Sequence, residues 1–145
     1  MDDHIPHPVA YMAAIITLYT RSMGESPTGK FGFAVNTRFG DLKQDNTWNS
    51  SWQEFWTFQM HQFLDREERV RGPHDANLVQ LKKFSFDRVL PRYLGPLESD
   101  GRSIQPCLLH GDLWPGNVKY KTGSESVCIY DASALLGHNE GISVH

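Results

Sequence analysis

The most constraining feature of this sequence is a polar loop that runs from His110 to Asn117 and is followed by a short predicted hairpin. The loop has the pattern H-x-D-x-x-x-x-N, and the second strand of the hairpin ends at Asp131. Asp112 and Asn117 are close enough in sequence for one tight loop to point both side chains into one cleft. The hairpin then returns the chain and adds the carboxylate of Asp131. The fold is therefore expected to gather three oxygen-bearing side chains.

Such an arrangement suits phosphoryl transfer. That reaction needs a carboxylate beside the acceptor hydroxyl, and it needs oxygen ligands for the magnesium ion that bridges the phosphates. We predict that Asp112 is the catalytic base, and that Asn117 and Asp131 are a neutral and an anionic metal ligand. A single loop aspartate is more often a turn cap, but the joint spacing of the three residues favours the functional interpretation.

The other residues of the loop are predicted to have supporting roles. His110 is expected to hold the loop by hydrogen-bonding to the backbone, and Gly111 and Gly116 are expected to support the same structure. Trp114 stands two residues after the predicted base, where its indole offers a flat apolar face that suits a sugar ring. We therefore predict that Trp114 contacts the substrate.

Composition and charge argue against several other classes of protein. The chain has 145 residues, enough for one domain with a buried core, and a formal net charge of -3. We expect no nucleic-acid partner and no membrane partner, because there is no basic surface to attract one and residues 9–18 are too short to span a bilayer. Cys107 and Cys128 lie in apolar strand-like runs, which predicts free thiols and a cytoplasmic location. Neither has a histidine at zinc-ligand spacing.

Hydrophobic periodicity predicts a helix over residues 9–19, and the glycine at position 24 is predicted to stop it. The same kind of pattern predicts a second helix over residues 46–64. Ser51 and Glu54 form a capping box in the second helix. The second helix carries an aromatic stripe, which we interpret as a buried face because no basic residues accompany it for stacking on bases. The stripe consists of Trp48, Trp52, Trp56, Met60 and Phe63.

A third helix is predicted over residues 76–90, and Pro91 is expected to stop it. Two short apolar runs on either side of a Thr-Gly-Ser turn, residues 118–120 and 127–130, predict a β-hairpin. The second of these runs leads directly into Asp131.

The glycines of residues 26–33 do not have the spacing of a phosphate-binding loop. This segment is therefore predicted to be a structured loop anchored by Phe31 and Phe33. Residues 37–44, which contain a Gly-Asp turn signal, are predicted to continue as loop.

The sequence resembles the fructosamine kinase family, the ketosamine 3-kinases that include the protein-ribulosamine 3-kinases. The resemblance rests on residues 108–117, which contain His-Gly-Asp-Leu-Trp-Pro-Gly-Asn, and on Asp131 with the strand before it. Residues 137–140 and the segment 26–33 also match, and the likeness is strongest over residues 26–140. The His-Gly-Asp-Leu-Trp-x-Gly-Asn pattern is more selective than the looser pattern of aminoglycoside and choline kinases.

The resemblance implies an α+β, protein-kinase-like fold, with this chain as its mainly helical C-terminal lobe and a small β-hairpin. It implies that ATP and Mg²⁺ are used to phosphorylate the 3-hydroxyl of ketosamines, either on glycated proteins or as small molecules. The 3-phosphate would be unstable, so the sugar would be shed and the amine restored. Asp112 matches the family's catalytic base, and Asn117 and Asp131 match its metal-binding positions.

The resemblance also implies an N-terminal lobe with a phosphate-covering loop and a strand lysine. Nothing before residue 26 has the strands or the glycine spacing for them, so we expect residues 1–145 to be a single partial domain that lacks this lobe. Three hypotheses remain open. The chain is a ketosamine 3-kinase impaired by truncation, a non-catalytic fragment or scaffold that keeps the acceptor pocket, or another small-molecule kinase of the aminoglycoside or choline type.

Overall fold

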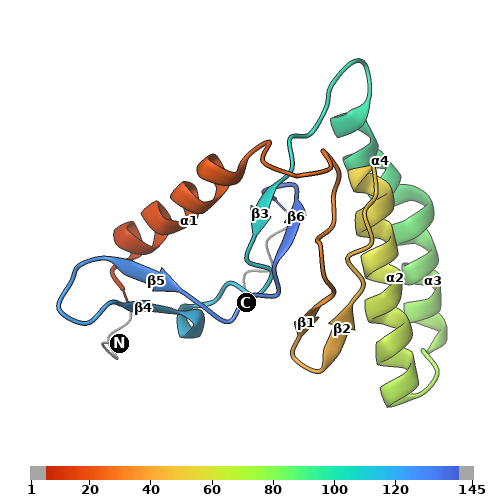
Figure 1. Ribbon diagram of the computed structural model, residues 1–145. Helices are drawn as coiled ribbons and strands as arrows, with labels where there is room; N and C mark the ends of the chain where they lie inside the picture. The colour runs from red at the N-terminus through yellow and green to blue at the C-terminus, as the bar shows by residue number, and fades with distance from the viewer. Residues whose placement is uncertain (1–5, 141–145) are drawn as a thin grey trace. The chain divides into compact units, whose positions relative to one another are not determined.

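The computed structural model describes residues 6–140, which contain both helices and short antiparallel strands (Figure 1). The helices are α1 (Pro8–Ser22), α2 (Trp52–Arg71), α3 (Ala76–Phe84) and α4 (Leu90–Leu94). The strands are β1 (Thr37–Phe39), β2 (Leu42–Gln44), β3 (Cys107–Leu109), β4 (Val118–Tyr120), β5 (Val127–Ile129) and β6 (Leu135–Gly137). Within the described residues they pair as β1 with β2, β3 with β6, and β4 with β5. This mixture confirms the predicted α+β class.

The chain divides into two compact units. The first consists of Met1–Gly29 together with Gln105–His145, and it contains α1 and the strand pairs β3–β6 and β4–β5. The second is Lys30–Ile104, and it contains the β1–β2 pair and helices α2, α3 and α4. The predicted loop and Asp131 both lie in the first unit.

A small hydrophobic core in the first unit anchors the predicted loop and the strand that follows it. Ile15 of α1 packs with Leu113 and Val118, and the latter two residues are each only 2% exposed. Further side chains pack around these three: Tyr11, Tyr19, Val127 and Ile129. Burial of apolar surface stabilises this arrangement, and Leu113 and Val118 stand in the loop and directly after it. The polar loop is therefore held down by its own apolar neighbours.

Helix α1 begins one residue before the predicted start and ends at Ser22, close to the predicted end near Gly24. Gly24 has a φ of +79°, and its N–H donates to the carbonyl of Pro106 at 2.9 Å. Ile15 is the buried side chain of this helix, whereas Met12 and Ile16 are 51% and 54% exposed.

Helix α2 begins later and ends later than predicted, at Trp52 and Arg71. The predicted capping box is confirmed in one half, since the hydroxyl of Ser51 accepts from the N–H of Glu54. The N–H of Ser51 donates to the Oδ1 of Asn49 at 2.8 Å instead of to Glu54. The predicted burial of the aromatic stripe is correct for Trp52, but Phe55 supplies the other fully buried ring of this face. The other stripe members are only partly buried: Trp48, Trp56, Met60 and Phe63.

Glu98 makes a cap for α2 that sequence analysis did not predict. Its two carboxylate oxygens accept from the backbone N–H groups of Trp52 at 2.8 Å and Gln53 at 3.0 Å. These donors lie in the first helical turn and have no partner within the helix. A carboxylate at this end also interacts favourably with the helix dipole. Glu98 therefore ties the start of α2 to the segment that follows α4.

The predicted end of the third helix at Pro91 is wrong. Helix α3 continues through a π-helical turn at Ser85–Val89 into α4. The N–H of Leu90 donates to the carbonyl of Ser85, so the turn accommodates one extra residue. Pro91 then stands in the first turn of α4, where its missing N–H costs little.

The predicted loop at residues 37–44 is also wrong. These residues form the β1–β2 hairpin, in which Arg38 faces Lys43 and Gly40 turns with a φ of +56°. The ring of Phe39 packs edge-on against Phe63 of α2, with centroids 6.3 Å apart. The sequence pattern did not reveal this hairpin because it contains few apolar residues. Its contact with α2 stabilises it.

The other strand and loop predictions are confirmed. The predicted hairpin is the β4–β5 pair, with Val118 opposite Ile129. Phe31 is 3% exposed and anchors its loop through two backbone hydrogen bonds with Asn49. Both cysteines are free thiols. Among the described residues, no helix combines the length and apolar character needed to cross a membrane.

The buried hydroxyl of Tyr19 generates a prediction about alkaline stability. This oxygen has no hydrogen-bond partner in the described part of the chain, and burial, with smaller effects of Cys107 and Tyr11, raises the pKa of Tyr19 from 10.0 to about 12. Between these pH values the unfolded state binds fewer protons than the folded state, so stability should fall as the pH rises from 10 to 12.

The Tyr19→Phe variant should lose this alkaline fall and be at least as stable as the parent at neutral pH, because it removes an unsatisfied polar group. Urea unfolding across this pH range measures both effects. Tyr93→Phe is the control, since Tyr93 is 69% exposed and its variant should keep the fall. Identical pH profiles for Tyr19→Phe and the parent would contradict the assignment.

Candidate active site

Three strands position the residues that sequence analysis singled out. The loop leaves the end of β3 at His110 and enters β4 through a 3₁₀ turn at Pro115–Asn117. Asp131 follows β5 after one further residue, Tyr130. The N–H of Tyr130 donates to the carbonyl of Asn117 at 3.0 Å, so the β4–β5 pairing is extended to the site.

The buried side chain of Asn117 joins the three predicted residues. It is 4% exposed, and its Nδ2 donates to the backbone carbonyl of Asp112 at 2.9 Å and to the Asp112 carboxylate at 3.3 Å. The same Nδ2 also lies 3.5 Å from the backbone carbonyl of Asp131. Because the amide nitrogen faces these oxygens, Oδ1 is the polar atom of Asn117 that remains for another partner.

His110 connects the loop to the end of β5. Its ring is buried, with Nε2 at 2.8 Å from the carbonyl of Tyr130 and Nδ1 at 3.3 Å from the N–H of Asp112. A carbonyl only accepts and an N–H only donates, so Nε2 carries the hydrogen and Nδ1 is the acceptor. With these two partners His110 is uncharged, and its ring holds the backbone of Asp112 against the end of β5.

Tyr130 belongs to the site, and sequence analysis did not identify it. Its hydroxyl donates to the carbonyl of Gly116 at 2.5 Å, and its backbone contacts both His110 and Asn117. The residue therefore holds the loop from three directions. In the sequence, the only feature that pointed to Tyr130 was its position directly before Asp131.

The two glycines of the loop are required for different reasons. Gly111 has a φ of +78°, and a Cβ on it would lie 2.3 Å from the carbonyl oxygen of Ser133. At Gly116 a Cβ would lie 2.2 Å from the indole of Trp114. The Trp114 ring therefore lies against Gly116, and it keeps 45% of its surface exposed.

The conformation and exposure of Asp131 distinguish it from an ordinary loop residue. It has a φ of +58°, a conformation that is uncommon outside glycine and that recurs at functional sites. It is exposed, whereas Asp112 is partly buried. The Nδ2 of Asn117 lies 3.5 Å from the backbone carbonyl of Asp131, so the two neighbouring residues together offer one anionic and one neutral side-chain oxygen. Such a set fits Mg²⁺, which usually keeps water and phosphate oxygens in its other positions.

Comparison with known proteins identifies the family. The model of the family described as "Fructosamine kinase" matches residues 13–142, which is most of the chain, so this chain belongs to the fructosamine kinase family. A protein-ribulosamine 3-kinase, chloroplastic, of Arabidopsis thaliana is 36% identical over 110 residues, which are 76% of this chain and 31% of that protein. A ketosamine-3-kinase of Mus musculus is 37% identical over 116 residues, which are 77% of this chain and 33% of that protein.

Solved structures agree with these sequence matches. A crystal structure from Thermobifida fusca, assigned as a fructosamine-3-kinase, has a TM-score of 0.71 and 27% identity, and the match covers 97% of this chain and 45% of that one. A second, from Haemophilus somnus, shares the fold at a TM-score of 0.65 and 18% identity over 97% of this chain and 43% of that one. The chain spans about a third of the length of the curated relatives described above.

The close contact at Gly111 generates a stability prediction with an internal control. Gly111→Ala and Gly123→Ala both place a Cβ on a residue of positive φ, which costs about 1 kcal/mol. Only Gly111→Ala also meets a backbone oxygen, because Gly123 has nothing within 4 Å. Gly111→Ala should therefore lower the free energy of unfolding by about 2 kcal/mol more than Gly123→Ala. Urea unfolding measures the difference, and equal losses would refute the contact.

Proposed function

We propose that this chain carries the acceptor-and-metal half of an ATP-dependent ketosamine 3-kinase. The reaction is phosphorylation of the 3-hydroxyl of ribulosamine or fructosamine on glycated protein lysines. The observation that carries this proposal is the Asn117 amide, which bonds to Asp112 and lies beside Asp131. Family membership and the names of the relatives support the choice of ketosamines as the substrate class.

In this proposal Asp112 is the general base. The N–H of Asn117 engages one carboxylate oxygen, Oδ2, and leaves the other for the acceptor hydroxyl. Asp112 takes the hydroxyl proton as the sugar oxygen bonds to the γ-phosphorus and the bond from that phosphorus to the leaving ADP oxygen breaks. His110 helps to hold Asp112 in place because its Nδ1 accepts from the Asp112 N–H. The phosphate ester formed is unstable, so the sugar is shed and the lysine amine is restored.

The Oδ1 of Asn117 and the carboxylate of Asp131 would hold Mg²⁺. Bound there, the ion would supply positive charge that offsets the charge on the ATP phosphates. Asp131 has a left-handed backbone, and its carbonyl lies 3.5 Å from the Nδ2 of Asn117. The contacts of this nitrogen keep the buried amide from rotating. Trp114 would supply an apolar face for the sugar ring next to Asp112.

We further propose that the chain corresponds to part of a kinase-like C-terminal lobe and that it acts in the cytoplasm. The nucleotide-covering part of such an enzyme would belong to the two thirds of the curated relatives that this chain does not span. This same coverage favours a second candidate function. In that function the chain binds the glycated acceptor without phosphorylating it.

Removal of either carboxylate tests the proposed chemistry. Asp112→Asn should reduce phosphate transfer from Mg-ATP to a ribulosamine-modified peptide by about 100-fold or more, because the hydroxyl proton loses its acceptor. Asp131→Asn should reduce transfer and also weaken Mn²⁺ binding followed by electron paramagnetic resonance, whereas Asp112→Asn should keep most of that binding.

Asp100→Asn is the matched control. Asp100 also has a positive φ, at 55°, and its side chain is 82% exposed outside the site. This variant should bind Mn²⁺ and transfer phosphate like the parent. If the parent transfers no phosphate but binds the glycated peptide, the scaffold function replaces the kinase function. Transfer that survives in Asp112→Asn would remove Asp112 from its proposed role.

Trp114 generates a separate prediction about acceptor affinity. Trp114→Ala should weaken binding of the ribulosamine peptide by about threefold to tenfold, and Trp114→Phe should weaken it less, because a smaller ring still stacks. Fluorescence anisotropy with glycated and unglycated peptides measures the effect. Phe84→Ala, which removes a ring that is 58% exposed elsewhere, is the control. Unchanged affinity in both Trp114 variants would exclude the sugar contact.

A further inference from the structure

A small basic pocket lies in the second unit, whereas the loop that carries Asp112 belongs to the first. It is lined by the β1–β2 hairpin and by α2, and its volume is about 220 Å³. Its polar lining residues are Arg38, Asp41, Lys43, Gln62, Arg66 and Arg69. Four cations therefore face one carboxylate, although the whole chain has a net charge of -3. This local excess of positive charge is not a consequence of overall composition.

Two contacts hold the two walls of the pocket in a fixed relation. The rings of Phe39 and Phe63 join the hairpin to α2, with centroids 6.3 Å apart. The Nε2 of Gln59 donates to the carbonyl of Asp45, just beyond β2, at 2.6 Å. The cations are therefore carried by secondary structure that packs together, and not by independent loops.

The positive charges of the pocket form two pairs of close neighbours, and the charges in each pair repel one another. Arg38 and Lys43 are direct cross-strand partners, and like charges in that position destabilise a hairpin. On α2, Arg66 and Arg69 are one turn apart on the same face, where like charges are also unfavourable. These two like-charge pairs are unfavourable for folding. A bound anion would offset the repulsion at both places.

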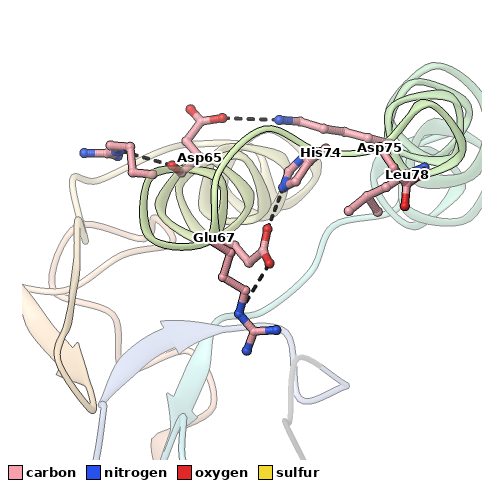
Figure 2. A network of polar contacts seen from close by, with 8 residues as sticks. Asp65, Glu67, His74, Asp75 and Leu78 are labelled. Carbon is pink, nitrogen blue, oxygen red and sulfur yellow. Dashed lines mark hydrogen bonds and ion pairs between the residues drawn. The ribbon is translucent and has the colours of Figure 1, made fainter.

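Two carboxylates of α2 are engaged with other partners. Asp65 pairs with Lys82 of α3 at 3.3 Å, and Glu67 pairs with His74 at 2.6 Å. Figure 2 shows the pair of Glu67 with His74. Arg69 donates from Nε to the backbone carbonyl of Asp65 at 3.1 Å. A carbonyl fixes the orientation of the guanidinium without cancelling its charge.

We propose that this pocket binds the phosphate dianion of a phosphomonoester. An excess of three positive charges suits a dianion better than a single carboxylate, and the planar N–H groups of arginine match phosphate oxygens. Gln62 adds a neutral donor from the same face of α2. The proposal is independent of the phosphotransfer chemistry proposed for the first unit.

The full chain can be titrated with inorganic phosphate, O-phosphoserine, a phosphoserine peptide and acetate at equal ionic strength. Side-chain Nε–H signals of Arg66 and Arg69 in ¹H–¹⁵N spectra should shift in a saturable manner with the three phosphate compounds and not with acetate. Equal affinity for phosphoserine and its peptide would mean that the pocket takes the phosphate group alone. Tighter binding of the peptide would identify a phosphorylated protein as the source.

The double variant Lys43→Gln/Arg66→Gln should bind phosphate about tenfold more weakly. Because it removes two repelling charges, its midpoint of thermal unfolding without phosphate should equal or exceed that of the parent, which separates lost binding from lost folding. Arg92→Gln, an exposed arginine of α4 outside the pocket, is the control and should bind like the parent. The proposal fails if Arg92→Gln weakens binding equally, if acetate shifts the same signals, or if a single-stranded oligonucleotide binds more tightly through them.

Discussion

The site depends on one buried amide. Burial of an amide without hydrogen bonds would cost free energy, so the side chain of Asn117 is stable at 4% exposure only because its nitrogen meets the oxygens of Asp112 and lies beside that of Asp131. The same contacts bring together two segments that are separated by a whole hairpin. The Nδ2 of Asn117 therefore links the two segments, and its Oδ1 is the atom proposed to bind a metal.

Neighbouring apolar residues of the loop have different environments. Leu113 is buried in the core and Trp114 is exposed, so adjacent residues face opposite directions. His110 and Tyr130 hydrogen-bond to the backbone around the loop, and the Asp112 carboxylate contacts Asn117. In the proposed function its other oxygen contacts the substrate. Apolar burial and hydrogen bonds thus hold the same few residues of the loop in place.

The features that were predicted correctly from the sequence are those with a local cause. The side-chain cap from Ser51 and the β4–β5 hairpin follow from neighbouring residues alone. The β1–β2 hairpin, the cap from Glu98 and the continuation past Pro91 depend on distant partners or on a π-helical turn that no periodicity reveals. The spacing predicted that Asp112, Asn117 and Asp131 lie near one another, and the contacts of Asn117 Nδ2 join these three residues. The role of Tyr130 was not predicted, because its contacts exist only after the hairpin has formed.

The contacts that bring these oxygens together join residues that are close in sequence. The bond from His110 to Tyr130 spans 20 positions, and the contacts of Asn117 with Asp112 and Asp131 span 5 and 14. Short loops of this kind lose little entropy on closure, so the geometry can form from this segment itself. In the proposed function, the parts of a full-length relative that this chain does not span would hold the nucleotide in line with the acceptor hydroxyl.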